Sequence, residues 1–418
     1  MTRTTTRIEA DYWIESAFPL AEAAEAMAGE QSSGTFLPLP GETPELKERS
    51  AARVAAIEDL GEVSGPSLPG AGRADQPHRQ GRVTFSWPID NMGPSLPNLL
   101  AAIAGNLFEL KQFSGLRLLD IRLPEDFAAA NPGPQFAVEG TRRLAGVEGR
   151  PLIGTIVKPS VGLDPEATAA LVADLAAAGL DFVKDDELQG DGPACPFDGR
   201  ARAVMAAIDR AADRTGQKLM FAFNLTGEID EMRRRHDLVL ALGGTCVMAN
   251  LTGVGLAGFL ALARHSALPL HAHRNGWGAL SRHPALGFDY VPWAKIWRLA
   301  GADHMHVNGL SNKFCEPDDS VIRSARSMLE PMFATKPCTV MPVFSSGQSA
   351  AQVHDTYAAL GSPDLIYAAG GGIMAHPGGP AEGVTALRDA WDAALAGETA
   401  QARAARSPAL AAALGKFA

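Results

Sequence analysis

A short run of charged residues at 184–187 has the composition of a metal site. It places Lys184 beside three consecutive acids, and two apolar residues precede it, as at the end of a buried strand. Carboxylates are hard oxygen donors of the kind that Mg²⁺ prefers. We interpret the run as a divalent-metal site in which Asp186 and Glu187 supply two ligands.

Lys184 can join such a site only in a changed chemical state. Its cation would repel a metal ion, and a neutral amine among carboxylates is unfavourable. Reaction of the amine with carbon dioxide would convert it into a carbamate, which offers a third oxygen ligand. The plain alternative is a salt bridge between Lys184 and a neighbouring aspartate, with no metal.

Polar residues also end five other buried runs of the chain. Each has an ordinary explanation when it is taken alone: a solvated lysine, a core histidine or a glycine turn. Taken together, they fall where the strands of an α/β barrel end and where such barrels collect catalytic groups. Glycines after the last strand would also offer backbone N–H groups to a phosphate. These runs lie at 158–160, 271–274, 304–313, 345–347 and 370–372.

The elements that must position these groups begin at about residue 136. From there, short apolar runs alternate with amphipathic helical patterns. Eight βα units over roughly 260 residues predict a (β/α)8 TIM barrel, with a doubly wound open sheet as the alternative. The chain after about 385 is alanine-rich and is predicted to be helical. The eight expected strands are 153–158, 182–187, 219–224, 246–250, 268–274, 304–308, 339–345 and 364–370.

The first part of the chain mixes strands and helices without strict alternation. This pattern suits a small sheet with helices on one face. We therefore predict an α+β domain at 1–135 and a barrel domain with a helical tail at 136–418. The expected elements of the first domain are strands at 7–14, 53–60, 82–89 and 116–123, helices at 20–28 and 96–108, and a loop at 65–81.

The composition is that of an ordinary globular enzyme. The chain has 418 residues, a net charge of −10 and 46% hydrophobic residues. The acidic balance argues against nucleic acid and anionic membranes as partners. Four widely separated cysteines form no disulfide framework, and we expect a reducing cytoplasmic location. The first residues show no signal-peptide core, and no apolar run is long enough to span a bilayer.

Seven short motifs are spread in order over nearly the whole chain. They are Gly-Glu-Gln-Ser-Ser-Gly-Thr at 29–35, Ala-Gly-Asn-Leu-Phe at 104–108, Gly-Thr-Ile-Val-Lys-Pro at 154–159, Asp-Phe-Val-Lys-Asp-Asp-Glu at 181–187, His-Ala-His-Arg at 271–274, Asp-His-Met-His at 303–306 and Gly-Gly-Gly at 370–372. Together they resemble the large subunit of ribulose-bisphosphate carboxylase (RuBisCO). The resemblance implies a ferredoxin-like N-terminal domain, a C-terminal TIM barrel, and a homodimer or larger assembly with active sites at the subunit interface.

The resemblance also implies roles for the residues around the metal. Lys184 would be the carbamylated lysine, and Asp186 and Glu187 would complete a Mg²⁺ site. Lys158 would be a proton-transfer lysine, and His273 would lie near the substrate. The implied catalytic residues are Lys158, Lys184, His273 and Lys313.

The remaining implied roles concern a phosphorylated substrate. Arg274 and His306 would hold one phosphate end, and Ser345 would contact substrate hydroxyl groups. Lys313 would lie at the tip of a mobile loop after the sixth strand. The other phosphate position would be formed by Gly347, Gly370 and Gly371. The residues that would reach in from the partner subunit are Glu30, Thr35 and Asn106.

The chain departs from the carboxylases of this family at several of these positions. Ser160 stands where they have a second lysine, and Ile156 replaces a threonine. Trp277 stands where a third histidine is expected, Phe36 replaces a tryptophan, and the loop 310–316 lacks their Gly/Val-rich run. We therefore expect no productive carboxylation of ribulose bisphosphate. In these respects the chain resembles the form IV, RuBisCO-like proteins.

Such a site is suited to stabilising an enediolate, because Mg²⁺ is a Lewis acid and a lysine can move a proton. Among the reactions of RuBisCO-like proteins, we favour action on 3-oxo-isoapionate 4-phosphate, by decarboxylation or by transcarboxylation and hydrolysis. The segments 275–277 and 308–315 resemble the branch of RuBisCO-like proteins that acts on this phosphorylated 3-oxo sugar acid, and the His–Arg–His–Lys set suits a polar, charged substrate. The alternatives are isomerisation of methylthioribulose 1-phosphate or enolisation of diketo-methylthiopentyl phosphate in methionine salvage, and a non-catalytic regulatory dimer.

Overall fold

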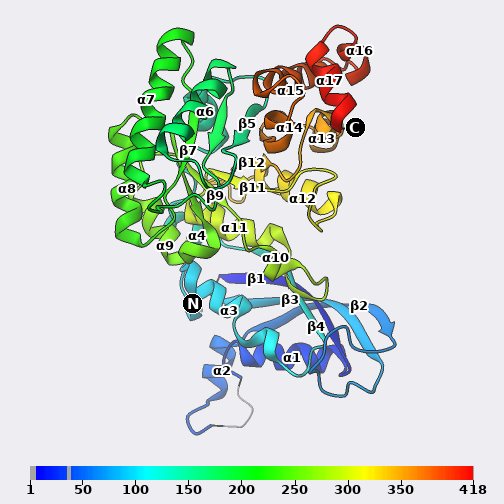
Figure 1. Cartoon of the computed structure of the whole chain (residues 1–418). Coiled ribbons are helices and arrows are strands. Elements are labelled where there is room, and N and C mark those ends of the chain that lie inside the picture. The colour runs from blue at the N-terminus through cyan, green and yellow to red at the C-terminus, as the bar shows by residue number, and fades with distance from the viewer. Residues whose placement is uncertain (1–5, 35–38, 418) are drawn as a thin grey trace. The chain divides into compact units, whose positions relative to one another are not determined.

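The computed structural model describes residues 6–34 and 39–417, which form two compact units (Figure 1). The first unit comprises the chain up to Asn131 together with 276–299 and 333–336, and the second comprises the remaining segments. Thr35 and Phe36 lie outside the described residues. Among the helices that the structure describes, none combines the length and the apolar character needed to cross a membrane.

The first unit is built on a five-stranded sheet in the order β10-β4-β1-β3-β2. Strand β1 pairs antiparallel with β3 and β4, and β2 pairs antiparallel with β3. Four strands in the order 4-1-3-2, with helices after the first and third strands, form the ferredoxin-like arrangement that the sequence predicted. Its strands are β1 (Arg7–Ser16), β2 (Arg53–Val63), β3 (His78–Pro88), β4 (Gly115–Arg122) and β10 (Leu286–Phe288).

Alternation along β1 explains why this sheet has one apolar face. Ile8, Ala10, Tyr12 and Ile14 are fully buried, while the intervening residues are half-buried. Helix α1 packs on β2 and β3, and the Tyr12 hydroxyl donates to the backbone oxygen of Ile103 in α3 at 2.6 Å. The helices of this unit are α1 (Leu20–Glu30), α2 (Pro44–Ser50), α3 (Leu96–Ala104), α4 (Glu125–Ala130), α10 (Gly278–Ser281) and α11 (Tyr290–Ala300), with short 3₁₀ turns η1 (Ile89–Asn91) and η2 (Asn106–Glu109).

Several details differ from the sequence predictions for this unit, which did not include helices α2 and α4. The helix expected at 96–108 ends at Ala104, because the backbone of Gly105 leaves the helical region before η2 begins. The loop expected to last until 81 is shorter, since β3 begins at His78. Strand β10 was not predicted; it pairs parallel with β4, with Leu286 opposite Leu116.

The second unit is a closed barrel of eight parallel strands, which confirms the TIM-barrel prediction over the open doubly wound sheet. Each barrel strand overlaps one expected run. Most observed strands are shorter than expected, β5 begins one residue earlier, and β8 has the expected bounds. Lys184, Asn224, His273 and His306 are the last residues of their strands, whereas polar residues that follow, such as Asp186, Glu187 and Arg274, belong to loops. The barrel strands are β5 (Leu152–Ile156), β6 (Phe182–Lys184), β7 (Met220–Asn224), β8 (Cys246–Asn250), β9 (Leu270–His273), β11 (His304–His306), β12 (Met341–Phe344) and β13 (Ile366–Ala368).

Helices surround the barrel strands, as Figure 1 shows for α6 to α9. Asp164 caps α6 by accepting from the backbone N–H of Ala167 at 2.7 Å, and α7 ends where Gly216 adopts a left-handed conformation. The helices of this unit are α5 (Ala137–Ala145), α6 (Pro165–Ala177), α7 (Phe197–Thr215), α8 (Ile229–Ala241), α9 (Leu251–His265), α12 (Asp318–Leu329), α13 (Val353–Leu360), α14 (Gly370–Met374), α15 (Pro380–Leu395), α16 (Ala400–Ala404) and α17 (Pro408–Phe417), with the 3₁₀ turn η3 (Ala350–Gln352).

The barrel interior is a packed core that ends in a polar floor. Leu152, Phe182 and Met248 belong to a buried apolar cluster drawn from several strands. Near it, Asp303 accepts from the backbone N–H groups of Phe136, Ala137 and Leu270 at 2.6, 2.8 and 2.9 Å, which ties the start of α5 to β9. This floor leaves the opposite, carboxyl ends of the strands for the functional groups.

Candidate active site

The lysine and the acids of residues 184–187 lie at the carboxyl end of β6. Lys184 is the last residue of the strand and is only 1% exposed. Its Nζ lies 3.1 Å from Glu187 Oε2 and donates to the backbone oxygen of Asp185 at 3.0 Å. Lys184, unmodified, is therefore paired with Glu187, whereas the salt-bridge interpretation expected an aspartate as its partner. The same contact brings its nitrogen to the carboxylate that the metal interpretation requires.

Burial sets the protonation of this pair. Desolvation lowers the pKa of Lys184, although Glu187 and Asp186 oppose the shift. A lowered pKa increases the fraction of neutral amine, which is the form that reacts with carbon dioxide. Burial raises the pKa of Glu187, but the charges of Lys184 and His273 outweigh it and bring the pKa to about 2. The donor set therefore fits a hard divalent cation: an ionised carboxylate, a second carboxylate on Asp186, and an amine that can become a carbamate.

The three acids of this run do not share one role. Asp185 is fully buried and accepts from Arg200, with Oδ2 to Nη2 at 3.2 Å, and from the backbone N–H of Asn224 at 2.9 Å. The Asn224 side chain donates to the backbone oxygens of Asp186 and Glu187, each at 3.4 Å. Asp185 and Asn224 thus hold the loop that carries the two ligand candidates. Sequence reasoning missed Asn224, although it is a polar residue that ends a buried strand at the same rim.

Lys158 follows β5 and contacts the same acidic group. Its Nζ donates to Asp186 Oδ2 at 2.6 Å and to Ser160 Oγ at 2.8 Å. The side chain is 43% exposed, whereas that of Asp186 is buried, so Lys158 lies on the open side of the cluster. A lysine in this position can deliver a proton to a substrate bound over the carboxylates.

Histidines from β9 and β11 line the next part of the rim. His273 Nε2 lies 3.4 Å from Glu187 Oε2. His271 and His306 share a hydrogen bond of 2.7 Å between their Nε2 atoms, and His306 Nδ1 lies 3.1 Å from Ser345 Oγ. Burial lowers the pKa of His273 to about 3 and those of His271 and His306 well below the usual value. These imidazoles are therefore neutral hydrogen-bonding groups near pH 7.

Arg274 is engaged by an acid from a different loop. Its Nη2 donates to Glu316 Oε2 at 2.5 Å, and Asn308 Nδ2 donates to the same oxygen at 2.8 Å. Ser346 Oγ in turn donates to Asn308 Oδ1 at 2.8 Å. Sequence reasoning gave Glu316 no role, because its partner lies 42 residues away in the chain.

The glycines and Lys313 occupy the other loops of the barrel mouth. Gly347 has a φ of +98°, which favours glycine, and the backbone N–H of Lys313 donates to the oxygen of neighbouring Ser346 at 3.1 Å. Lys313 Nζ lies over the Phe314 ring, 5.2 Å from its centre, and both residues are exposed. Gly370 and Gly371 begin α14, where first-turn N–H groups lack intrahelical acceptors and can face an anion.

The residues expected to serve a neighbouring subunit lie in the first unit. Asn106 Nδ2 donates to Glu30 Oε1 at 3.4 Å, which brings the end of α1 beside the start of η2. Thr35, the third member of this group, falls outside the described residues. Trp277 packs against Tyr290, with ring centres 5.0 Å apart.

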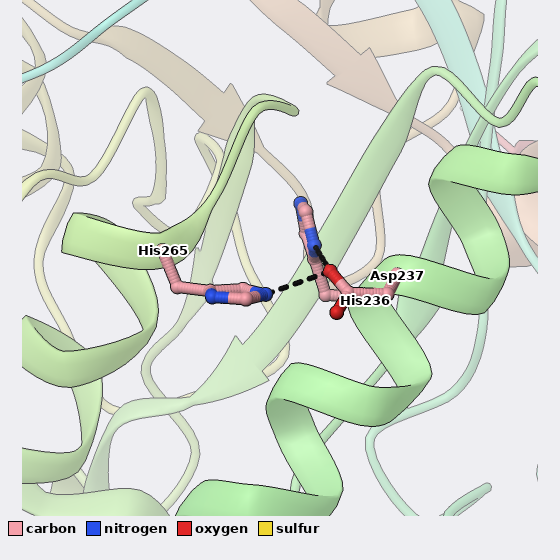
Figure 2. Close-up of side chains that lie close together, drawn as sticks. All are labelled: His236, Asp237 and His265. Carbon is pink, nitrogen blue, oxygen red and sulfur yellow. Dashed lines mark hydrogen bonds and ion pairs between the residues drawn. The ribbon is translucent and has the colours of Figure 1, made fainter.

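A second cluster of metal-ligating residue types lies away from these groups, between α8 and α9 (Figure 2). Asp237 Oδ1 lies 2.9 Å from His236 Nδ1 and 2.7 Å from His265 Nε2. His236 Nε2, however, accepts from the backbone N–H of Ala267 at 3.1 Å, so its proton resides on Nδ1. A metal on Nδ1 would move that proton to Nε2, against the N–H of Ala267. The geometry therefore describes a hydrogen-bonded clamp between two helices.

Comparison with known proteins agrees with this geometry. Residues 137–417 match the model for the ribulose bisphosphate carboxylase large chain, catalytic domain, and residues 10–127 match that for its N-terminal domain. The chain thus belongs to the RuBisCO large-chain family. It is 57% identical over 409 residues to the 3-oxo-isoapionate-4-phosphate transcarboxylase/hydrolase of Xanthobacter autotrophicus, covering 98% of this chain and 99% of that one.

Solved structures of the same family share the fold over nearly the full length. A rubisco-like protein from Burkholderia fungorum superposes with a TM-score of 0.93 at 45% identity, over 98% of this chain and 100% of that one. The octameric ribulose-1,5-bisphosphate carboxylase/oxygenase of Pyrococcus horikoshii gives a TM-score of 0.88 at 31% identity, over 98% and 93%. The chain is therefore similar both to RuBisCO-like proteins and to a carboxylase.

Proposed function

We propose that this protein is a Mg²⁺-dependent enzyme that acts on 3-oxo-isoapionate 4-phosphate, as a decarboxylase or as a transcarboxylase/hydrolase. The observation that carries the proposal is the 57% sequence identity, over nearly the full length of both chains, to the Xanthobacter transcarboxylase/hydrolase. The contacts between Lys158 and Asp186 and between Lys184 and Glu187 supply the groups that such a reaction needs.

Lys184, Asp186 and Glu187 would hold the cation, with Lys184 as its carbamate. When bound, Mg²⁺ supplies Lewis-acid polarisation of the substrate's carbonyl group. The protein's part is to prepare the ligands: burial favours the neutral amine of Lys184, and Asn224 holds the backbone of the ligand loop. The imidazole of His273 lies beside Glu187 and borders the acidic cluster on the side of the histidines.

Lys158 would donate the proton that the reaction requires. When a 3-oxo acid loses its carboxyl group as carbon dioxide, the bonding electron pair stays on the substrate as an enediolate, and one carbon must then gain a proton. Lys158 is the exposed cation nearest the carboxylates, and its ammonium can donate that proton. Asp186 and Ser160 hold its Nζ from two sides, which orients it.

The same residues argue against net carboxylation of ribulose bisphosphate. Ser160 has a short hydroxyl side chain where the resemblance expects a second lysine, and this hydroxyl is hydrogen-bonded to Lys158. A serine cannot place a second ammonium over the substrate. Enediolate chemistry therefore keeps its proton carrier, while the carboxylase reaction lacks one of its two lysines.

The proposed enzyme is a homodimer or larger assembly with shared sites. Support comes from the octameric Pyrococcus relative and from the pairing of Glu30 with Asn106, two residues that the family resemblance assigns to the neighbouring subunit's site. The assembly would bring this pair to the barrel mouth of a second copy.

The direct test incubates the purified protein and Mg²⁺ with 3-oxo-isoapionate 4-phosphate and, separately, with methylthioribulose 1-phosphate. We expect turnover of the first, with release of carbon dioxide or of phosphoglycerate, and none of the second. Turnover of methylthioribulose 1-phosphate alone would replace this proposal with an isomerase of methionine salvage. Turnover of neither, with no Mg²⁺-dependent binding of either compound, would indicate a non-catalytic protein.

A further inference from the structure

Arg274 is a buried cation at the mouth of the barrel. It follows β9, its side chain is 8% exposed, and its guanidinium has the planar fork that recognises carboxylates and phosphates. In this protein Nη2 donates to Glu316 Oε2 at 2.5 Å. A carboxylate of the chain itself therefore occupies part of the surface that an incoming anion would use.

Glu316 is built into this position by contacts on both of its oxygens. Besides Arg274, Oε2 accepts from Asn308 Nδ2 at 2.8 Å, and Oε1 accepts from Ser320 Oγ at 3.0 Å. Its backbone oxygen accepts from Asn312 Nδ2 at 2.9 Å. The side chain is 14% exposed. Moving the carboxylate away from Arg274 would break several of these bonds at once.

The contacts of Asn308 extend this network across the rim. Asn308 Oδ1 accepts from Ser346 Oγ at 2.8 Å, and Ser346 follows Ser345, whose Oγ lies 3.1 Å from His306 Nδ1. His306 is held neutral because burial lowers its pKa. Arg274 and Glu316 therefore offset each other's charge within this ion pair.

Because of this ion pair, the site should bind a substrate with one phosphate differently from a substrate with two phosphates. A phosphate placed at Arg274 would bring its own charge within reach of the Glu316 carboxylate, and like charges at this range repel. A phosphate at the glycine end would meet backbone N–H groups at Gly347, Gly370 and Gly371 instead. A substrate with one phosphate can use the glycine end and leave an uncharged end toward Arg274.

We propose that Glu316 makes this site selective for sugar or sugar-acid substrates with a single phosphate, by holding Arg274 in an internal ion pair where a bisphosphate would place its second phosphate. The proposal rests on the proposed function, whose substrate name denotes one phosphate. Glu316 is then a specificity-determining residue that acts through Arg274 and takes no part in the bond-breaking step.

The test measures binding by titration calorimetry with Mg²⁺ and bicarbonate present, using two probes that differ only in the second phosphate: ribulose 1-phosphate and ribulose 1,5-bisphosphate. The variant is Glu316→Gln, which keeps the shape of the side chain and an oxygen acceptor for Asn308. The matched control is Asp319→Asn, because Asp319 is 77% exposed and pairs with Arg323 on α12. Thermal unfolding checks that each variant is folded, and Glu316→Ser is a second uncharged variant if the glutamine does not fold.

We expect Glu316→Gln to tighten bisphosphate binding by about tenfold or more and to change monophosphate binding by less than about threefold. Asp319→Asn should leave the ratio of the two affinities unchanged. The proposal is overturned if the ratio does not move in Glu316→Gln, if Asp319→Asn moves it equally, or if neither probe binds wild type or variant. Because this experiment measures binding, its outcome is separate from that of the turnover assay. A shifted affinity ratio without turnover would contradict the proposed function alone. Turnover with an unshifted affinity ratio would contradict this inference alone.

Discussion

At the scale of single residues, two lysines contact different acids of the run 184–187, and the proposal gives them separable tasks. Lys184 is buried at the end of β6 and pairs with Glu187, whereas Lys158 is largely exposed and reaches Asp186 from the open side. The first geometry suits a ligand, and the second suits a proton carrier. This division gives the two lysines different expected phenotypes.

Replacing each lysine with alanine should separate these tasks. Lys158→Ala should lower kcat by about 10²- to 10⁴-fold, as expected for loss of a general acid, while a carbamate signal persists in ¹³C NMR spectra with labelled bicarbonate. Lys184→Ala should lose both turnover and the signal. A carbamate that survives in Lys184→Ala, or one that vanishes in Lys158→Ala, would contradict the assignment.

The buried His304 should make the barrel sensitive to acid. Burial lowers its pKa to about 3, whereas a histidine in the unfolded chain titrates near 6.5. Acidification from pH 6.5 toward 3 therefore protonates the unfolded state first, and stability that is fully present above pH 6.5 is progressively lost. This group alone should lower the free energy of unfolding by about 2 kcal/mol between pH 7 and pH 5.

Urea unfolding at pH 7 and pH 5 measures this loss. In His304→Gln the difference between the two pH values should be smaller than in wild type by about 2 kcal/mol, whatever the variant's absolute stability. An unchanged difference would show that His304 does not resist protonation in the folded state.

Sequence reasoning succeeded for residues whose signal is local and failed where a partner is distant. The run 184–187 could be recognised because its lysine and acids are adjacent in the chain. The partner of Asp185 is Arg200 on α7, and the partner of Glu316 is Arg274 on another loop. Such pairings depend on which strands become neighbours, so they emerge only with the closed barrel.

At the scale of elements, strand identity was predictable but strand length was not. Barrel strands are buried on both sides and read as short apolar runs, which marked all eight positions. Some polar residues at the ends of the runs, such as Lys158, Asp186 and Arg274, were assigned to strands, whereas they belong to the loops that follow. Strand β10 was missed because three residues with no distinct local pattern pair with β4, which lies more than 160 residues away in the chain.

Asp303 should be a main anchor between α5 and β9. Its two carboxylate oxygens accept from three backbone N–H groups, those of Phe136, Ala137 and Leu270. Asp303→Ala would leave these donors buried without their acceptor, so the free energy of unfolding should fall by about 3 kcal/mol or more. Chemical denaturation followed by circular dichroism measures the change.

The matched control for this experiment is Asp230→Ala on α8. The Asp230 side chain is 96% exposed and pairs only loosely with Arg233, at 3.4 Å. Its loss should change stability by less than about 0.5 kcal/mol. Equal effects of the two substitutions would mean that the Asp303 contacts do not anchor the barrel floor.

At the scale of the whole molecule, the barrel was predicted from the alternation of apolar runs and helical patterns. The family and its ferredoxin-like domain were predicted from the resemblance of short motifs, and the family is confirmed. The assembly is a separate matter, because a subunit interface leaves little periodic signal in one chain. The proposed sharing of sites makes a sharp prediction about mixtures of variants.

Glu30→Gln and Lys184→Ala should each be inactive as pure assemblies if each site takes Glu30 from one subunit and Lys184 from another. Co-expression with two affinity tags, followed by purification on both, would yield mixed dimers in which one of the two sites, about half of the wild-type number, takes both residues in wild-type form. Activity in the doubly purified mixture, beside a molar mass of at least a dimer by sedimentation, would support shared sites. An inactive mixture would place both residues in sites formed within one chain.

The central claim is that this protein breaks the bond to the carboxyl carbon of a phosphorylated 3-oxo sugar acid with a site centred on Lys184. The most direct measurement follows 3-oxo-isoapionate 4-phosphate labelled with ¹³C in its carboxyl group by NMR, in the presence of Mg²⁺. With wild type, the label should leave the substrate and appear in bicarbonate or in phosphoglycerate, and with Lys184→Ala it should stay in place. A label that remains in the substrate with active, folded wild type, or that leaves it equally fast with Lys184→Ala, would contradict the account.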